Sequence, residues 1–241
     1  MGKILTNSLI FGGKELGNLG VIEKVDRPFL PPMKTIEKEI LGRDGVIHKN
    51  LMFDPLFITI SIRLFNDITN RIDDIIFDLM ESVYSRELKP LNYRQSRVWY
   101  DAILVDVSNY GKFRNSYAYM DLTFKVPSGF GRSQFMRDEY KSFTQKEINI
   151  SSVLPTKGIF TFTGSSNKIT NKRTGEFIEI LSGASGNFVI DCEKEIVTIN
   201  NNRAMDRVSL YTDFFEIKDG DVITASNSVN LKFYEKYLYD R

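Results

Sequence analysis

Residues 57–64 alternate between two kinds of side chain with a period of two, and this pattern restricts the fold more than any other feature. Successive side chains of an extended strand point to opposite faces, so an alternating segment predicts a strand with one buried face. The face expected in the core carries Ile58, Ile60, Ile62 and Leu64. The other face carries Phe57, Thr59, Ser61 and Arg63. A chain with such a segment is expected to place a sheet against an apolar layer.

The segments before this strand are short, extended and interrupted by glycine and proline. Residues 21–25 alternate in the same way, and residues 41–45 (Leu-Gly-Arg-Asp-Gly) have the composition of a tight turn. Between them, Pro28 and Pro31 stiffen residues 26–33 and cannot donate the backbone hydrogen bonds of a central strand. We therefore expect residues 26–33 to be extended and to cross toward a neighbouring element or subunit.

One amphipathic helix is predicted next, over residues 67–83. Its apolar residues recur at spacings typical of one helix face. They are Ile68, Ile72, Ile75, Ile76, Leu79 and Val83. Asp73 and Asp74 belong to the opposite, solvated side, which predicts a helix that packs on a sheet through one face only.

The rest of the chain predicts strands. Residues 93–107 and 117–126 are long runs that we expect to pair as a hairpin, with the corner at residues 109–115. From residue 148 onward, short strands separated by polar turns are typical of an antiparallel sandwich. The strands expected there cover residues 158–163, 176–181, 187–192, 196–200, 207–211, 222–225 and 229–237. The predicted fold class is mainly β, with a sandwich-like N-terminal domain that carries one α-helix and a C-terminal β-sandwich.

A change in composition marks the expected domain boundary. Residues 127–133 are rich in glycine and serine, and residues 137–147 are charged with little periodicity. We therefore predict an N-terminal domain over residues 1–130, a linker or arm over residues 131–147, and a C-terminal domain over residues 148–241.

The composition excludes several classes of function. Lys and Arg together number 32 and Asp and Glu 31, so the chain lacks the basic excess of a protein whose main role is binding nucleic acid. No apolar run approaches the ~20 residues that span a bilayer, and we expect no membrane association. The single cysteine, Cys192, fits folding in a reducing cytosol.

Residues suited to catalysis are few. The only histidine, His48, lies in a turn-adjacent segment with no thiol or second imidazole beside it. Residues 182–186 are one residue short of a nucleophile elbow. Residues 219–221 (Asp-Gly-Asp) predict a tight turn before a strand, because a calcium loop needs more oxygen ligands. We expect a protein that is not an enzyme and that needs no cofactor or metal.

Taken in order, these segments resemble the distal tail proteins of long-tailed, non-contractile bacteriophages, a family also found in prophages of Gram-positive bacteria. The resemblance covers nearly the whole chain, and it depends on the order of the motifs. In the first half they are residues 11–16 (FGGKEL), 21–25 (VIEKV), 42–45 (GRDG), the alternating strand, the helix, 97–102 (RVWYDA) and 117–127. In the second half they are residues 186–192 (GNFVIDC) and 197–201 (VTINN).

The resemblance implies a structural virion protein that is made in the host cytoplasm and forms a homohexameric ring at the tail tip. The first domain would form the ring through which the tape-measure protein and later DNA pass, with DNA only as passing cargo. The second domain, similar to galectin-like or carbohydrate-module sandwiches, would project outward and hold the adsorption apparatus. The implied partners are the tail tube protein, the tape-measure protein, the tail-associated tip protein and receptor-binding proteins. Longer relatives carry an inserted sugar-binding module, for which this chain has no room.

We expect the assembly interface at Arg43 and Asp44 in the turn and at Pro28 and Pro31 in the stiff segment. These residues flank strands at a sheet edge, where unpaired backbone groups need a partner, and closing a ring supplies one. Two other classes stay open. A soluble carbohydrate-binding β-sandwich protein in host-surface attachment would bind glycans as a monomer, whereas a tail-associated hydrolase would need a catalytic set.

Overall fold

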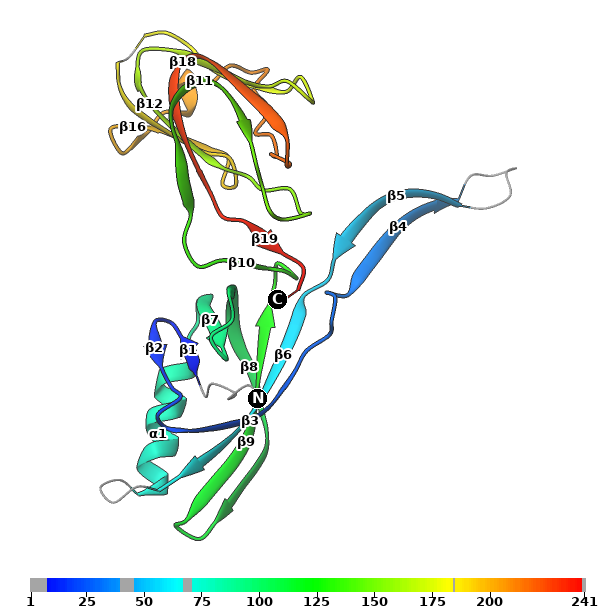
Figure 1. Ribbon diagram of the computed structural model, residues 1–241, viewed down its shortest axis with the longest axis vertical. Helices are drawn as coiled ribbons and strands as arrows, with labels where there is room; N and C mark the ends of the chain where they lie inside the picture. Colours follow the sequence, from blue (N-terminus) through cyan, green and yellow to red (C-terminus); the bar gives the residue numbers. More distant parts are fainter. Residues whose placement is uncertain (1–7, 40–45, 67–70, 184, 240–241) are drawn as a thin grey trace, which may run out of the picture. The chain divides into compact units, whose positions relative to one another are not determined.

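The computed structural model describes residues 8–39, 46–66, 71–183 and 185–239, and the chain divides into two compact units. The first unit contains the described residues up to Gly131 together with Leu238 and Tyr239, and the second contains residues 132–237. Apart from one α-helix and one short 3-10 helix, the regular structure described is β-strand (Figure 1). The mainly-β fold class is confirmed.

The first unit is built on an antiparallel sheet with the strand order β2-β1-β7-β8-β9-β6-β3. A separate two-stranded sheet, β4-β5, belongs to the same unit. The strands are β1 (Leu9–Phe11), β2 (Lys14–Glu15), β3 (Gly20–Asp26), β4 (Met33–Glu39), β5 (Val46–Phe53), β6 (Leu56–Phe65), β7 (Lys89–Tyr93), β8 (Val98–Phe113) and β9 (Tyr117–Val126).

The alternating segment forms β6 and has the predicted faces. The side chains of Leu56 and of every second residue from there to Leu64 are fully or almost fully buried, whereas that of Phe57 is exposed. β6 pairs with β9 without interruption from Leu56 opposite Val126 to Phe65 opposite Tyr117. The inward side chains of β9 are also apolar and buried, so the two strands share one core face.

The helix α1 (Ile72–Val83) lies on this core face and contacts β6 and β9 (Figure 1). Its buried residues Ile72, Ile75, Leu79 and Val83 are four of the six expected. Each such side chain contributes roughly 1.5–3 kcal/mol when it leaves water. The helix begins at Ile72 rather than at residue 67, and residues 67–70 lie outside the described chain. Two carboxylates in the first turn favour this start through the helix dipole.

The segment from residue 93 to residue 115 differs from its prediction. The expected strand over residues 93–107 is interrupted after Tyr93, because Arg94 and Gln95 adopt positive φ values of 52° and 53° and form a turn. The strand β8 then continues into the expected corner as far as Phe113, and the turn to β9 follows at residues 114–116. Asn109, with φ of 49°, lies at a register shift in the β8–β9 ladder, so a bulge absorbs the residue that suggested a corner.

The second unit consists of antiparallel strands in the order β14-β13-β18-β12-β15-β16-β17, with β11 also paired to β18. The long strand β18 pairs with β13 through its first half and with β12 through its second half. The strands are β11 (Arg137–Ile148), β12 (Ile159–Gly164), β13 (Asn167–Asn171), β14 (Phe177–Ile180), β15 (Gly186–Asp191), β16 (Ile196–Ile199), β17 (Asn202–Arg203) and β18 (Asp221–Phe233). Short strands β10 (Gly131–Ser133) and β19 (Lys236–Tyr237) precede and follow this set.

One apolar core holds the strands of the second unit together. It takes residues from β11 to β16 and from β18, and Phe162 and Phe188 stack in it with ring centroids 4.6 Å apart. Because both groups of strands joined by β18 contribute, they close over the same apolar layer. None of the helices in the described parts of the chain has the length and apolar character that crossing a membrane requires.

Residues 137–147 were expected within a linker or arm, yet with Ile148 they form β11. Three register shifts interrupt its pairing with β18, between Arg137 and Tyr140, between Tyr140 and Phe143, and between Phe143 and Gln145. Each shift changes which residues face inward, so only Tyr140, Phe143 and Ile148 are buried. The bulges therefore remove the period of two that would have revealed this strand.

Two further predictions for the second unit are wrong. Residues 207–211 do not form a strand, because the 3-10 helix η1 (Met205–Arg207) leads into a single bridge at Val208 and then a turn. The strands expected at residues 222–225 and 229–237 are mostly one strand, β18, whose exposed middle residues suggested a break.

Candidate functional site

Of the four residues predicted for the assembly interface, two can be placed. Arg43 and Asp44 lie outside the described residues. Pro28 and Pro31 lie in the segment that joins β3 to β4 and belongs to no strand; Pro28 is exposed and Pro31 is buried. The side chain next to Pro28, Phe29, is 75% exposed. The segment is therefore unpaired and presents a bulky ring to solvent, and its role in assembly stays a prediction.

The strand order of the first unit ends at β3 on one side, and on the other side β7 covers only part of the long strand β8. Residues 20–26 pair with one described strand, β6. At the other side, β7 pairs with residues 100–102 of β8. Residues 103–113 of β8 pair with β9 along one edge, and the short strand β10 also pairs with β8. The backbone N–H and C=O groups along the outer edge of a sheet can bind a further strand.

The free edge of β8 also carries large apolar side chains. Val105, Val107, Tyr110 and Phe113 are 49%, 40%, 56% and 56% exposed. Soluble monomers protect long edge strands with charges, prolines or bulges, since an apolar free edge invites another chain. This edge combines those apolar side chains with two register shifts and with the exposed charges of Asp106 and Lys112.

The sheet face opposite α1 is a mixed surface. Phe57, Phe65 and Tyr119 are 48%, 46% and 44% exposed there. Between them, the Arg63 guanidinium lies 2.6 Å from the Glu23 carboxylate. Aromatic rings beside ion pairs are typical of protein–protein contacts, in which rings supply area and charges set the orientation.

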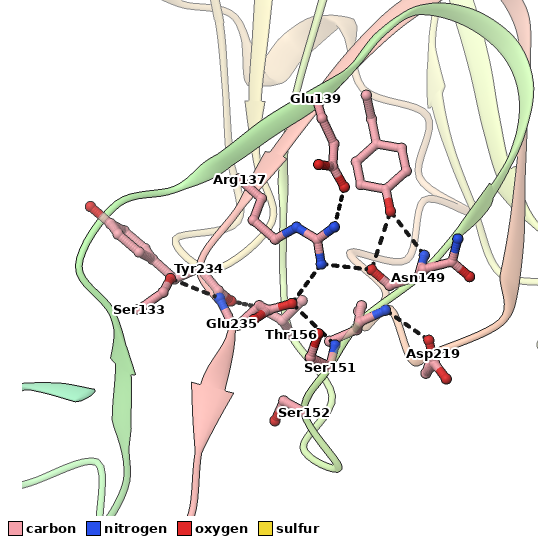
Figure 2. Close-up of polar contacts among 12 residues, drawn as sticks. Ser133, Arg137, Glu139, Asn149, Ser151, Ser152, Thr156, Asp219, Tyr234 and Glu235 are labelled. Atoms are coloured by element: carbon pink, nitrogen blue, oxygen red, sulfur yellow. Dashed lines mark hydrogen bonds and ion pairs between the residues drawn. The ribbon is translucent and has the colours of Figure 1, made fainter. Parts of the chain in front are cut away.

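A polar network in the second unit joins the start of β11 to the residue pair that follows β18 (Figure 2). Arg137 starts β11, and Glu235 follows β18. Nη1 of Arg137 donates to Oε1 of Glu235 at 2.6 Å and to the Asn149 carbonyl at 2.9 Å. Nη2 donates to the Glu139 carboxylate. The same guanidinium lies 5.8 Å from the ring centre of Phe233, so the cation is enclosed by acceptors and an aromatic ring.

Glu235 is the buried member of this network, with a side chain only 8% exposed. The Ser151 amide donates to Oε1 at 3.1 Å, and the Tyr237 hydroxyl donates to Oε2. Burial, the largest single influence, raises the pKa of this carboxyl, but the donors from Tyr237, Ser151 and Arg137 together outweigh it. The pKa of Glu235 therefore falls below its ordinary value, and the carboxylate stays ionised at neutral pH.

A second buried carboxylate, Asp221, starts β18. Arg173 donates from Nη2 at 3.0 Å, Asn171 from Nδ2 at 2.8 Å, and the Lys218 amide at 2.9 Å. Gly220, with φ of 77°, forms the predicted tight turn just before it. Protein donors occupy the carboxylate oxygens, so Asp221 holds the turn in place and is not free to bind a cation.

The reactive side chains named in the sequence are not assembled into a site. Cys192 is fully buried, and burial raises the pKa of its thiol to about 12. The thiolate is therefore absent at neutral pH. His48 lies in β5. In the part of the chain that the structure describes, no three His, Cys, Asp or Glu side chains gather as a metal site would require.

The second unit has a shallow polar pocket of about 410 Å³ over β12 and β15. Its polar side chains bind one another: Thr163 donates to Asn187 at 2.7 Å, and Asn230 donates to Thr161 at 3.3 Å. The aromatic residues of its lining, Phe162 and Phe188, are 4% and 1% exposed and belong to the core. The pocket thus lacks the exposed ring on which a sugar stacks.

Comparison with known proteins identifies the second unit. Residues 152–237 match the family model described as the siphovirus-type tail component, C-terminal domain. Over 96% of this chain and 99% of the other, the fold is similar to the crystal structure of the phage SPP1 Dit (gp 19.1) protein, with a TM-score of 0.76 and 13% identity. The resemblance to the distal tail proteins is confirmed. The SPP1 protein is described as a paradigm of the hub adsorption apparatus in phages that infect Gram-positive bacteria.

Other structures with the distal tail fold belong to baseplates. Chains of the phage P2 baseplate in its activated conformation, with calcium and with strontium, match with TM-scores of 0.56 and 0.54 and identities of 10% and 9%. Each match covers 94% of both chains. No curated protein sequence matches the chain. Residues 152–237 are thus similar to a siphovirus-type tail component domain, and the structural matches show that the fold across both units is similar to that of a distal tail protein.

Sequence reasoning missed the free edge of β8 and the network around Glu235. The apolar edge residues were divided between the strand expected over residues 93–107 and the corner expected at residues 109–115, so the sequence did not present them as one edge. The sequence near Glu235 does not show most of its network, because two of its three donors, the Arg137 guanidinium and the Ser151 amide, lie 98 and 84 positions away. A carboxylate directly after a long apolar strand, next to Phe233 and Tyr234, is the only local indication of burial.

Proposed function

We propose that the protein is a structural virion protein, the hub at the distal end of a phage tail, and that its first unit closes into a homohexameric ring. The observation that carries this proposal is the sheet with free edges on two opposite sides. In a ring, each subunit offers one edge and receives another, which is a heterologous contact repeated by rotation. The strand β8 of one copy would pair with β3 of the next, and the apolar residues from Val105 to Phe113 would leave water.

The partners of such a hub follow from its position at the end of the tail tube. The ring would bind the tail tube protein on one side and the tail-associated tip protein on the other. The tape-measure protein, and later DNA as cargo, would pass through it. The second unit, which matches a tail component domain, would hold receptor-binding proteins. This assignment places the protein at the tail tip of the virion after synthesis in the host cytoplasm.

A soluble carbohydrate-binding protein is the competing function. The polar pocket of the second unit is the natural place for a glycan, but its side chains already bind one another and it exposes no aromatic ring. The hub assignment accounts for the free edges of the first unit, whereas a free lectin leaves them unexplained.

The oligomeric state of the purified full chain tests the proposal. We expect a particle of six times 27.8 kDa by light scattering and six-fold rings in negative-stain images. An antibody against the second unit should label virions at the tail tip only. A protein that stays monomeric at high concentration and binds glycans, or one that is absent from virions, would contradict the proposal.

The residues Arg43, Asp44, Pro28 and Pro31 are proposed as part of the ring contact. Charge reversal at Arg43 or Asp44, or deletion of residues 42–50, should give folded subunits that fail to form rings or form less stable ones. If the deletion variant still supported infectious particles, this segment would not belong to the interface. The strand-edge contact would then need its own test.

A further inference from the structure

The β4–β5 hairpin of the first unit is attached at its root (Figure 1). Within the described chain, β4 and β5 pair with each other and with no other strand, and a two-stranded ribbon alone is marginally stable in water. The root has an entry arm, residues 27–32, and an exit arm, residues 53–55. The Asp54 amide joins the two arms by donating to the Pro32 carbonyl at 2.8 Å. The direction of the hairpin therefore depends on what holds these arms.

The exit arm is held by the turn that follows β9. Gly129, with φ of 75°, lies so close to this arm that an added Cβ atom would be 2.7 Å from the Asp54 carbonyl oxygen and 2.9 Å from the Phe53 Cβ atom. The neighbouring Phe130 ring meets the Phe53 ring edge-on, with centroids 6.4 Å apart. This arm is therefore packed against backbone that β9 positions.

The entry arm is held by the C-terminal segment. Phe29 is 75% exposed, yet its ring stacks on that of Tyr239 with centroids 5.8 Å apart and planes 18° apart. Tyr239 belongs to the first unit. The other side-chain anchor, from Arg27 Nη1 to the Tyr100 hydroxyl, is a long hydrogen bond of 3.3 Å. Three prolines within residues 28–32 have fixed φ angles, so one fixed point restricts the whole arm.

We propose that Tyr239 is the positioning residue of the β4–β5 hairpin, and that Leu238 and Tyr239 form a latch that presents the hairpin to the next copy of this chain. The proposal rests on the proposed ring, whose contact includes Arg43 and Asp44 between the two strands. A hairpin held by one arm can turn about that arm, and each ring contact must then order it at an entropic cost. With both arms held, the hairpin is ordered when the subunit folds. The latch thus strengthens the ring without touching the neighbouring copy.

Hydrogen exchange in the purified full chain tests the latch itself. Samples are diluted until light scattering reports single subunits, so that assembly does not protect the amides. We expect Tyr239→Ala to speed exchange at the Asp54 amide about two- to tenfold, because the aromatic pair that orders the entry arm is lost. Tyr239→Phe keeps the ring and should exchange like wild type, as should Tyr211→Ala, which removes an exposed ring of the second unit. Equal exchange in wild type and Tyr239→Ala, or fast exchange in Tyr239→Phe, would overturn the proposal.

Assembly of the same variants tests what the latch does. Tyr239→Ala should keep the melting temperature of wild type, while the protein concentration at which half of the rings dissociate rises about threefold or more. Tyr239→Phe and Tyr211→Ala should assemble like wild type. Rings of wild-type stability from Tyr239→Ala would contradict the latch and leave the hub function standing.

A covalent latch separates positioning from direct contact. Phe29→Cys with Tyr239→Cys should assemble as poorly as Tyr239→Ala, and a short bis-maleimide that bridges the two thiols should restore the rings. The natural Cys192 is fully buried, so the reagent reaches only the introduced pair. Neither aromatic ring remains in this variant, so restoration means that position, and not ring contact with the next copy, is what counts. Bridged protein that still fails to assemble would overturn the proposal. A wild-type chain that forms no rings would contradict the proposed hub ring and, with it, the purpose of the latch.

Discussion

At the scale of single residues, Glu235 has the most consequence for the second unit. It is a nearly buried carboxylate whose charge is matched by Arg137 and whose oxygens accept bonds from three parts of the chain. Isolated buried charge is costly, so a fully matched network stabilises the fold only while every member is present. The residues that end β18 and start β11 therefore depend on one another, although 98 positions separate Arg137 from Glu235.

Removing the cation should destabilise the second unit. We expect Arg137→Met to lower its free energy of unfolding by about 2–3 kcal/mol, because Glu235 is left buried and unpaired. The only tryptophan, Trp99, belongs to the first unit, so hydrogen exchange at the amides of β11 and β18 is the appropriate measurement.

Lys141→Met on the same strand is the matched control. Lys141 pairs with Asp138 at 3.4 Å, but both side chains are more than half exposed. Removing this pair should change stability by less than about 0.5 kcal/mol. If both variants lowered the free energy of unfolding equally, burial would not make the Arg137–Glu235 pair more stabilising than an exposed ion pair.

The lowered pKa of Glu235 gives stability a defined pH dependence. A carboxyl whose folded pKa lies below its unfolded value stabilises the fold above the unfolded pKa and ceases to do so as pH falls through the folded pKa. The stability difference between wild type and Glu235→Gln should be largest above about pH 5 and should shrink below about pH 4. Urea unfolding followed by circular dichroism at several pH values measures it. A difference that stays constant from pH 7 to pH 3 would contradict this assignment.

At the scale of elements, the edge strands β11 and β8 differ in the side chains that they expose. β11 pairs only with β18, but it carries exposed charges along most of its length and three register shifts. Such an edge repels further strands. The edge of β8 has two register shifts and exposes four large apolar side chains from Val105 to Phe113 beside two charges. The β11 edge is thus mostly charged, whereas the β8 edge is largely apolar.

Charges placed on the free edge of β8 should prevent assembly without unfolding the subunit. Val105 and Val107 are roughly half exposed, so Val105→Lys with Val107→Lys should leave the melting temperature within a few degrees of wild type. In a ring these lysines would lie in the contact, and light scattering should report monomers.

Val153→Lys, on an exposed site of the second unit, should still form rings. Rings of normal stability from the β8 variant would exclude this edge from the contact.

The elements could be predicted where their periodicity is regular. β6 and β9 alternate without a bulge, and the burial pattern of their residues was visible in the sequence. β11 could not be recognised because its bulges destroy the alternation, and residues 207–211 resembled a strand although their turn is fixed by bonds to β14. The pairing of edges depends on which strands meet in space, which local sequence does not encode.

At the scale of the whole molecule, the chain consists of two units whose connection is a short segment around Gly131 and Arg132. The composition change at residues 127–133 was visible in the sequence, whereas the return of the last residues to the first unit was not. Leu238 and Tyr239 belong to the first unit through long-range packing, which no pattern in the C-terminal sequence indicates. The domain ranges 1–130 and 148–241, with a linker between them, stay a prediction for the independently folding pieces.

Limited proteolysis should locate the boundary. We expect trypsin to cut first at Arg132, in the three-residue strand β10 that joins the two units, and to leave residues 137–148 intact because they pair with β18 over a longer stretch. Denaturing gels with mass spectrometry should then show two pieces of about half the chain. A first cut at Lys141 or Lys146 would place the flexible segment inside β11 instead.

The pairing of β10 with β19 has a consequence for how this chain can change. The Ser133 amide and the Glu235 carbonyl lie 2.9 Å apart, so the second unit starts and finishes at almost the same point. A domain with adjacent ends can be spliced into a host chain, or exchanged for another, with little distortion of the segments that flank it. The second unit can therefore be exchanged between chains as one piece. A tail tip could acquire a new attachment specificity by swapping residues 132–237 while the machinery of the first unit is inherited unchanged.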